Sequence, residues 1–417
     1  MKRWPPFAGW KVVAGSALGI GFSAQIFIAT GYTILAAALG NAFGWTLAEL
    51  APGATLFLLG QMVGFPFMGS LLDRFGTRRV AAAGIAIFGL MLLALSRVTA
   101  TWQLYVLMLV MGLAGPASYT LPYLRALSLW FVRRRGLAIG LAAAGIALGA
   151  ATIPLGLQKI GTLHGWSAAL VALGLFELLV CLPVVLALVR DDPAPLGLAP
   201  DGDAIPAAQG AAGVAARESL AQRGLTATEA LRTADFWLMG SVYLVAGLAV
   251  YGVITNTAYI LSQTGARLST EQVAMVQAVG GIAVLLGRIA GGYALDRLGT
   301  RAIAVFMTML IAVAIFGYAT ATSLGMVLVS AILLGLATGG EGDVLPFMAV
   351  KYFGPRAFGK IYGMLGGMFS AGTALGPVTY AGLAALSGSP SMPLLLFSAV
   401  TAVSALAFIG VGRRPPP

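Results

Sequence analysis

The stretch Leu286–Arg301, LGRIAGGYALDRLGTR, joins an arginine inside an apolar segment to a short basic turn. An earlier copy of its second half is Gly69–Arg78, GSLLDRFGTR. Four residues keep their place in both copies and are separated by one constant offset: Gly69, Asp73, Gly76 and Arg78 return as Gly292, Asp296, Gly299 and Arg301.

The same offset recurs at other landmarks of the chain. Two of them are helix-start patterns, Thr46-x-x-Glu49 and Ser269-x-x-Gln272, which predict capping boxes in which two side chains satisfy free backbone N–H groups. Three more pairs are Gly140 with Gly363, Gly149 with Gly372 and Pro154 with Pro377. The chain is therefore predicted to consist of two copies of one unit.

The composition indicates a membrane protein. Of the 417 residues, 59% are hydrophobic and only 9% are charged, whereas about 25% are charged in soluble proteins. The net charge of +11 would suit nucleic acid, but its distribution argues against that partner. All but five of the 25 Lys and Arg fall on the inner side of the predicted topology, as the positive-inside rule requires. The others are Arg97, Lys159 and Arg267 on the outer side, and Arg125 and Arg288 within helices.

Apolar segments of about 20 residues, the length that spans a bilayer, occur twelve times. We expect an all-α membrane protein with twelve transmembrane helices in two six-helix pseudo-repeats and both termini in the cytoplasm. The first six spans are Val12–Leu35, Glu49–Leu72, Val80–Leu95, Leu104–Phe131, Leu137–Leu157 and Ser167–Val189. The second six are Phe236–Leu261, Glu271–Leu295, Ala302–Ala319, Leu324–Val350, Ile361–Leu386 and Pro393–Val411.

These spans predict three regions: a bundle over 1–190, a cytoplasmic linker over 191–232, and a second bundle over 233–417. The linker mixes acidic residues with prolines and an Ala/Gly stretch, which predicts little fixed structure. Thr226-x-x-Glu229 near its end predicts the start of a helix. Gly115, Pro116 and Pro122 predict a break or bend in the fourth span.

The doubled pattern Gly-x-x-x-Asp-Arg-x-Gly-x-Arg after the second span of each copy resembles the major facilitator superfamily. This resemblance implies a secondary transporter whose two halves expose one site alternately to each side of the membrane. It further implies a monomer in the bacterial inner membrane. The loop motifs would form cytoplasmic latches that stabilise the outward-open state, with Asp73, Arg74, Arg78, Arg125, Asp296, Arg297 and Arg301 as their members.

Other stretches resemble the monocarboxylate transporters and the bacterial oxalate/formate exchangers. They are Gly9-Trp10-Lys11, Trp130-Phe131-x-x-Arg134-Arg135-Gly136, Gly340-Glu341-Gly342-Asp343, Lys351-Tyr352-Phe353-Gly354 and the lone Arg288 of the eighth span. This likeness implies a small carboxylate substrate such as lactate or pyruvate, moved by proton symport or by anion exchange.

The chain departs from both groups. Val284 stands where the animal carriers have an aspartate, and the eleventh span lacks the central lysine of the oxalate exchangers, since Lys360 lies only at its cytoplasmic edge.

Five ionisable residues fall inside predicted spans, where an unpaired charge costs several kcal/mol. Arg288 lies ~12 Å deeper than Asp296 along a helix. Its planar cation suits a carboxylate substrate, or a structural pair with Glu341 or Asp343. Arg125 is expected to pair with Asp73, with substrate contact as the alternative.

The acidic residues within the spans can be interpreted as a structural gate or as proton carriers. Glu341 and Asp343 form either an inner-gate cluster with the loop arginines or a proton-carrying site, and Glu177 is a third candidate for proton coupling. Further candidates for the substrate site, supported by weaker evidence than Arg288, lie on spans that face the cavity in this superfamily. Each is equally suited to a helix–helix hydrogen bond. They are Gln25, Tyr32, Tyr119, Tyr123, Asn256 and Tyr259.

Features of enzymes and pumps are missing from the sequence. Cys181 is the single cysteine and His164 the single histidine, so we expect no disulfide, no metal site and no cofactor. The sequence shows no phosphate-binding loop either, which leaves an ion gradient or exchange as the energy source. A membrane receptor or scaffold and an efflux carrier for amphipathic compounds remain as alternatives.

Overall fold

The computed structural model describes residues 7–202, 224–354 and 356–411, without the side chains of Leu47, Thr270, Asp296 and Asp343. Helices dominate this part of the chain, and it contains no β-strand. The chain divides into two compact units. Unit 1 comprises Met1–Gly224 with Pro355–Met364, and unit 2 comprises Leu225–Gly354 with Leu365–Pro417.

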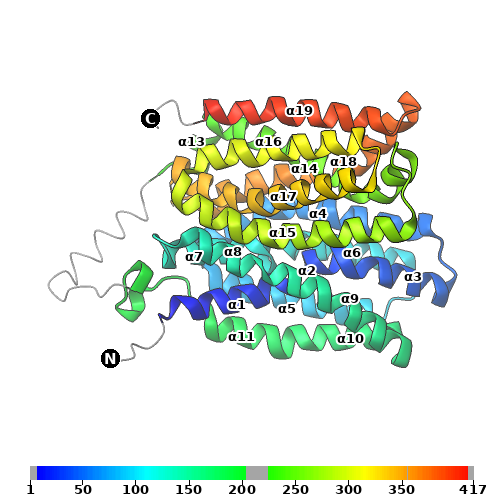
Figure 1. Cartoon of the computed structure of the whole chain (residues 1–417). Coiled ribbons are helices and arrows are strands. Elements are labelled where there is room, and N and C mark those ends of the chain that lie inside the picture. The colour runs from blue at the N-terminus through cyan, green and yellow to red at the C-terminus, as the bar shows by residue number, and fades with distance from the viewer. Residues whose placement is uncertain (1–6, 203–223, 355, 412–417) are drawn as a thin grey trace, which may run out of the picture. The chain divides into compact units, whose positions relative to one another are not determined.

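In unit 1, several predicted spans consist of shorter segments that lie end to end, as α10 and α11 do in Figure 1. The first three spans are α1 (Gly9–Gly21) with α2 (Ala24–Ile26), the π-helical turn η1 (Phe27–Gly31) and α3 (Tyr32–Phe43); α4 (Leu47–Phe75); and α5 (Thr77–Leu95). The next three are α6 (Thr101–Ser118) with α7 (Thr120–Trp130); α8 (Arg135–Ala143) with α9 (Gly145–His164); and α10 (Trp166–Phe176) with the π-helical turn η2 (Glu177–Cys181) and α11 (Leu182–Leu188).

In unit 2, each span is one continuous helix, preceded by the short α13 (Ala227–Leu231). The six long helices are α14 (Ala234–Gln263), α15 (Thr270–Leu298), α16 (Thr300–Thr320), α17 (Leu324–Phe353), α18 (Phe358–Ser387) and α19 (Ser391–Gly410). The first turns of α18 belong to unit 1. Within the described residues, eleven spans have the length and apolar composition to cross a membrane, and α18, with 30 residues, is the remaining long helix.

The backbone repeats with the same offset as the sequence. Residues with positive φ lie at equivalent positions of the two copies, in the turns that follow helices. The pairs are Gly44 (φ 71°) with Arg267 (φ 42°), Gly76 (φ 80°) with Gly299 (φ 82°), and Gly165 (φ 86°) with Gly388 (φ 63°). Glycine tolerates this conformation without a steric cost, which explains its place in the two loop motifs. The predicted twelve-helix repeat is therefore confirmed.

Side chains at helix starts also behave as the sequence predicts. In all three predicted capping boxes the acid or amide at the fourth position accepts the N–H of the first residue. The bonds are Thr46 N to Glu49 Oε2 at 2.8 Å, Thr226 N to Glu229 Oε2 at 2.7 Å, and Ser269 N to Gln272 Oε1 at 2.9 Å.

Glycines bring the second and fourth helices of each unit into backbone contact. A Cβ added at Gly64 on α4 would collide with the carbonyl oxygen of Leu113 on α6. The equivalent pair in unit 2 behaves identically, because a Cβ at Gly287 on α15 would collide with the carbonyl oxygen of Leu336 on α17. Small residues at such crossings allow the close approach on which packing in lipid depends.

The fourth span breaks between α6 and α7, as its prolines predict. Tyr119 is extended (φ −99°, ψ −150°) and separates the two helices. Pro122 lacks an N–H and would clash with the carbonyl of Ser118 in a continuous helix. At the third position of α7 the missing N–H is one that needs no intrahelical partner. The first span breaks at Ser23, beside the break of the fourth span. There the N–H of Ala24 donates to Ser118 Oγ at 3.5 Å.

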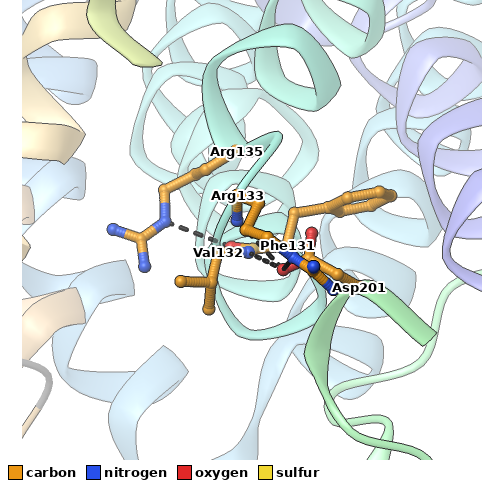
Figure 2. A network of polar contacts seen from close by, with 5 residues as sticks. All are labelled: Phe131, Val132, Arg133, Arg135 and Asp201. Carbon is orange, nitrogen blue, oxygen red and sulfur yellow. Dashed lines mark hydrogen bonds and ion pairs between the residues drawn. The ribbon is translucent and has the colours of Figure 1, made fainter. Parts of the chain in front are cut away.

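The prediction of little fixed structure is wrong for the start of the linker. Asp191 Oδ1 accepts the N–H of Arg78 at 2.9 Å. Asp201 Oδ2 accepts the N–H groups of Val132 at 3.1 Å and Arg133 at 2.9 Å (Figure 2). Both carboxylates accept N–H groups of basic segments between spans, so this part of the linker is fixed to unit 1. Residues 203–223 of the predicted linker lie outside the described residues.

Candidate functional site

In unit 2, the guanidinium of Arg288 on α15 lies against a glycine of α17. A Cβ added at Gly342 would lie 3.4 Å from Arg288 Nη1 and 3.6 Å from Nη2. Because Gly342 has no side chain, the planar cation reaches the backbone of α17 at this point. The backbones also come close one turn earlier, where a Cβ at Gly339 would lie 2.9 Å from the Arg288 amide nitrogen.

The neighbour of this glycine, Glu341, is 5% exposed. Its Oε1 accepts a hydrogen bond of 3.3 Å from Thr308 Oγ1 on α16. Thr308 also donates to the carbonyl of Ala304 at 2.9 Å, so one hydroxyl is shared between the two acceptors. The carboxyl therefore points toward α16. The side chain of Asp343 lies outside the described residues.

The two units differ at this level of the bundle. By the offset between the two copies, the stretch Glu341–Asp343 is equivalent to Ser118–Thr120, where the fourth span breaks. Unit 2 thus has acids on a continuous helix where unit 1 has hydroxyls around an extended tyrosine. We infer that the two copies have diverged at this position, with the charges on unit 2.

Two of the polar and aromatic candidates for the substrate site make helix–helix hydrogen bonds. Tyr32 Oη donates to the carbonyl of Leu50 at 2.5 Å, which joins α3 to α4. Asn256 Nδ2 donates to the carbonyl of Gly252 at 2.9 Å and to that of Pro377 on α18 at 3.5 Å. The sequence left two roles open for Tyr32 and Asn256, substrate contact and helix–helix hydrogen bonding, and these bonds correspond to the second.

Gln25, another candidate, accepts a hydrogen bond at its Oε1 on α2 from Gln61 Nε2 on α4. The three remaining tyrosines differ in exposure. Tyr119 lies half-buried at the break of the fourth span. Tyr123 is fully buried, whereas the side chain of Tyr259 is 51% exposed.

Glu177 is 1% exposed and begins the turn η2. The Cys181 thiol lies within hydrogen-bonding reach of its carboxyl, and Tyr123 is close enough to interact with it electrostatically. The sequence singled out the acid and the tyrosine for different roles, and the structure places them together in unit 1.

The loop aspartate of the first copy caps a helix. Asp73 Oδ1 accepts the N–H of Gly359 at 2.8 Å, and its Oδ2 accepts the N–H of Lys360 at 2.8 Å, in the first turn of α18. Arg125 Nη1 donates to the carbonyl of Leu72, next to Asp73, and interacts with its carboxylate. Negative charge at a helix N-terminus is stabilising, so these contacts hold the start of α18 in unit 1.

The last arginines of the two loop motifs have equivalent partners. Arg78 Nε donates to the carbonyl of Leu186 at 2.9 Å, near the end of α11. Arg301 Nη2 donates to the carbonyl of Val411, just after α19. Each arginine therefore joins the third helix of its unit to the end of the sixth.

The other motif residues lie beside aromatic rings. The Arg74 guanidinium is 5.1 Å from the Phe75 ring centre, and that of Arg297 is 4.4 Å from the Tyr293 ring centre. The side chain of Asp296 lies outside the described residues.

Three side chains that make hydrogen bonds in the structure were not predicted from the sequence. Thr308 gave no signal, because a threonine within an apolar span is common. Asp191 and Asp201 stood out only as acids in a linker. Acids that follow the sixth span by a few residues can reach the basic loops on the same side of the bundle, and their position in the sequence was the available signal.

Comparison with known proteins agrees with this architecture. The family model described as Major Facilitator Superfamily matches residues 17–321 and 241–417. The 4-hydroxybenzoate transporter PcaK of Pseudomonas putida is 27% identical over 424 residues, covering 96% of this chain and 91% of that protein. Monocarboxylate transporter 1 of Homo sapiens is 31% identical over 166 residues, covering 40% of this chain and 33% of that protein.

Solved structures share the fold. The human organic anion transporter MFSD10 superposes with a TM-score of 0.72 at 15% identity, covering 97% of this chain and 100% of that chain. The E. coli fucose:proton symporter FucP superposes with a TM-score of 0.69 at 11% identity, covering 98% of both chains. With the doubled motif, the repeated backbone and the family match, the chain belongs to the Major Facilitator Superfamily and is a multi-pass membrane transporter rather than an enzyme.

Proposed function

We propose that this protein carries small organic acids across the bacterial inner membrane by alternating access, with proton symport as the driving reaction. Relatives named for 4-hydroxybenzoate and for monocarboxylates support the substrate class, because both kinds of molecule carry one carboxylate. A monocarboxylate such as lactate or pyruvate is the proposed substrate.

The observation that carries the proposal is Arg288 beside Gly342. Arginine keeps its charge in a membrane interior and presents parallel N–H donors that match a carboxylate. An intramembrane cation is costly to keep, which favours a functional role for it. We propose that Arg288 binds the substrate carboxylate. Further contacts are proposed for Gln25, Tyr32, Tyr119, Tyr123, Asn256 and Tyr259.

Proton coupling is proposed for the acids next to this site. Glu341 lies one residue from Gly342, and its partner among the described residues is a neutral hydroxyl, that of Thr308. A neutral partner allows a carboxyl to accept and release a proton. Asp343 is proposed with it from the sequence. On the cytoplasmic side, the Asp73 cap on α18 is proposed as a latch that opens during the transport cycle, together with Arg74, Arg78, Arg125, Asp296, Arg297 and Arg301.

Uptake into proteoliposomes tests this function. Labelled lactate and labelled 4-hydroxybenzoate would be followed with and without an imposed inward proton gradient. Accumulation above equilibrium only with the gradient is expected. Uptake that appears only when the same acid is loaded inside the vesicles would show anion exchange instead. Absence of uptake in both arms would contradict the substrate class and leave efflux of amphipathic compounds to be tested.

Glu341→Gln separates the coupling role from binding. The neutral amide keeps the size of the side chain but cannot cycle a proton. We expect this variant to lose gradient-driven accumulation while it retains exchange of substrate across the membrane. Gradient-driven accumulation at the wild-type level would remove Glu341 from the coupling mechanism.

A further inference from the structure

The turn η2 places an acid inside unit 1. Glu177–Cys181 is π-helical, and the N–H of Leu182 bonds to the carbonyl of Glu177. Pro183 favours this turn, because it lacks an N–H and its ring would clash with the carbonyl of Leu179 in a regular helix. Such single π-turns are rare and occur often at functional sites.

Two buried polar atoms at this turn are left unsatisfied. Within the described residues, neither Glu177 Oε1 nor Tyr123 Oη has a hydrogen-bond partner. Tyr123 comes from α7, and its hydroxyl lies so close to Gly19 on α1 that a Cβ there would collide with it. The Glu177 Cβ packs on Gly89 of α5, where an added Cβ would lie 3.2 Å away. Glu177 therefore packs against α5, and the tyrosine with which it interacts packs against α1.

No cation in the described neighbourhood reaches this carboxyl. The only charged residues of α5 are two arginines in its first turn, ~15 Å along the helix from Gly89. Lys11 on α1 lies ~12 Å from Gly19, and Arg125 on α7 is bonded to α4. The segments α10 and α11 carry no charged residue. Among the described residues, the titratable groups that interact with Glu177 are therefore the Cys181 thiol and the Tyr123 hydroxyl.

We propose that Glu177, with Tyr123 and Cys181, forms a proton-binding site in unit 1 that is separate from the Glu341 site of unit 2. An ionised carboxylate without a cation or a set of donors is strongly disfavoured in an apolar interior, so the side chain holds its proton. On release, the proton goes to bulk water and leaves the charge facing the Tyr123 hydroxyl.

The site is placed to respond to movement of the broken helices. Tyr123 lies in the first turn of α7, directly after the break at Tyr119. Phe176, which precedes Glu177, packs on Phe22 at the break of the first span, with ring centres 4.8 Å apart. Opening at either break would admit water to Glu177 and favour loss of its proton. Protonation therefore stabilises the closed packing of α1, α7 and η2.

Infrared spectroscopy of the purified protein at neutral pH tests the protonation state without any substrate. Wild type is expected to show the carbonyl-stretch band of a protonated carboxyl group that is missing in Glu177→Gln. Exposed Glu271 provides the control, since Glu271→Gln should keep the band. Cys181→Ala should shift the band to higher frequency, because the carbonyl loses a donor. A spectrum of Glu177→Gln that retains the full band would overturn the proposal.

Thermal unfolding gives a second readout that is also independent of substrate. A carboxyl that is protonated when buried and ionised when unfolded stabilises the protein less as pH rises. From mildly acidic to alkaline buffer, wild type should lose more thermal stability than Glu177→Gln. Equal losses in both proteins would contradict the site. Failure of the uptake experiment would not affect either readout, so the two proposals can fail separately.

Discussion

Among single residues, Asp73 makes a double contact that predicts a measurable loss. Both carboxylate oxygens accept N–H groups of α18. Asp73→Ala removes this cap and should cost about 1–2 kcal/mol of stability, the usual range for a lost helix cap. Asp73→Asn retains one acceptor and should fall in between. Thermal unfolding in detergent measures both, and wild-type stability of the alanine variant would contradict the cap.

The sequence predicted the chemistry of such residues better than their partners. The motif predicted the importance of Asp73, but the N–H groups that it accepts belong to residues 359 and 360, and no local pattern links positions so far apart. The same limit applies to Arg78, whose partner is the carbonyl of Leu186. A backbone carbonyl has no signature in a sequence. Only the packed helices show which one an arginine can reach.

Among the helices, glycine contacts predict which substitutions disrupt packing. Gly64→Ala and Gly287→Ala each place a methyl group against a backbone carbonyl, which cannot move aside as a side chain would. Each should cost about 1–3 kcal/mol, the range for overpacking. Gly281→Ala on α15 is the matched control, because nothing lies within 4 Å of its added Cβ. Equal thermal stability of the Gly287 and Gly281 variants would contradict the close crossing.

The linker contact predicts a change in proteolysis. Asp201 binds the N–H groups of Val132 and Arg133, and its carboxylate lies 3.8 Å from Arg133 Nε. Asp201→Ala should release this loop and speed tryptic cleavage at residues 133–135. Asp192→Ala is the control, because among the described residues Asp192 bonds within its own turn, to the N–H of Ala194 at 2.7 Å. Unchanged cleavage of the Asp201 variant would show that the carboxylate does not hold the loop.

The interruptions of the helices were only partly predictable. Pro122 predicts the break in the fourth span, since proline has a known steric effect on the preceding turn. No proline near Ser23 predicts the break in the first span, which lies beside the break in the fourth. There the neighbouring helix supplies a hydroxyl, Ser118 Oγ, to the freed N–H of Ala24. That bond depends on tertiary packing, which the sequence does not display.

For the chain as a whole, the sequence predicted the architecture because the signals were long and repeated. Apolar spans, basic loops and the constant offset between the two copies all describe the same twelve-helix arrangement. The boundaries 190 and 233 remain predictions from span limits. The compact units follow contacts instead, so that the start of α18 belongs to unit 1 through Asp73. Sequence patterns describe helices, whereas contacts decide which unit a helix end joins.

The role of Arg288 in recognising a carboxylate is the central claim, and one comparison tests it most directly. Uptake of labelled lactate and 4-hydroxybenzoate would be measured for wild type, Arg288→Lys and the exposed-loop control Arg97→Lys. Lysine keeps the charge but loses the planar pair of donors, so the apparent affinity should fall by about 10- to 100-fold, as expected for a lost charge-assisted bond of about 1.5–3 kcal/mol. Arg97→Lys should match wild type. Wild-type affinity in Arg288→Lys would contradict the account.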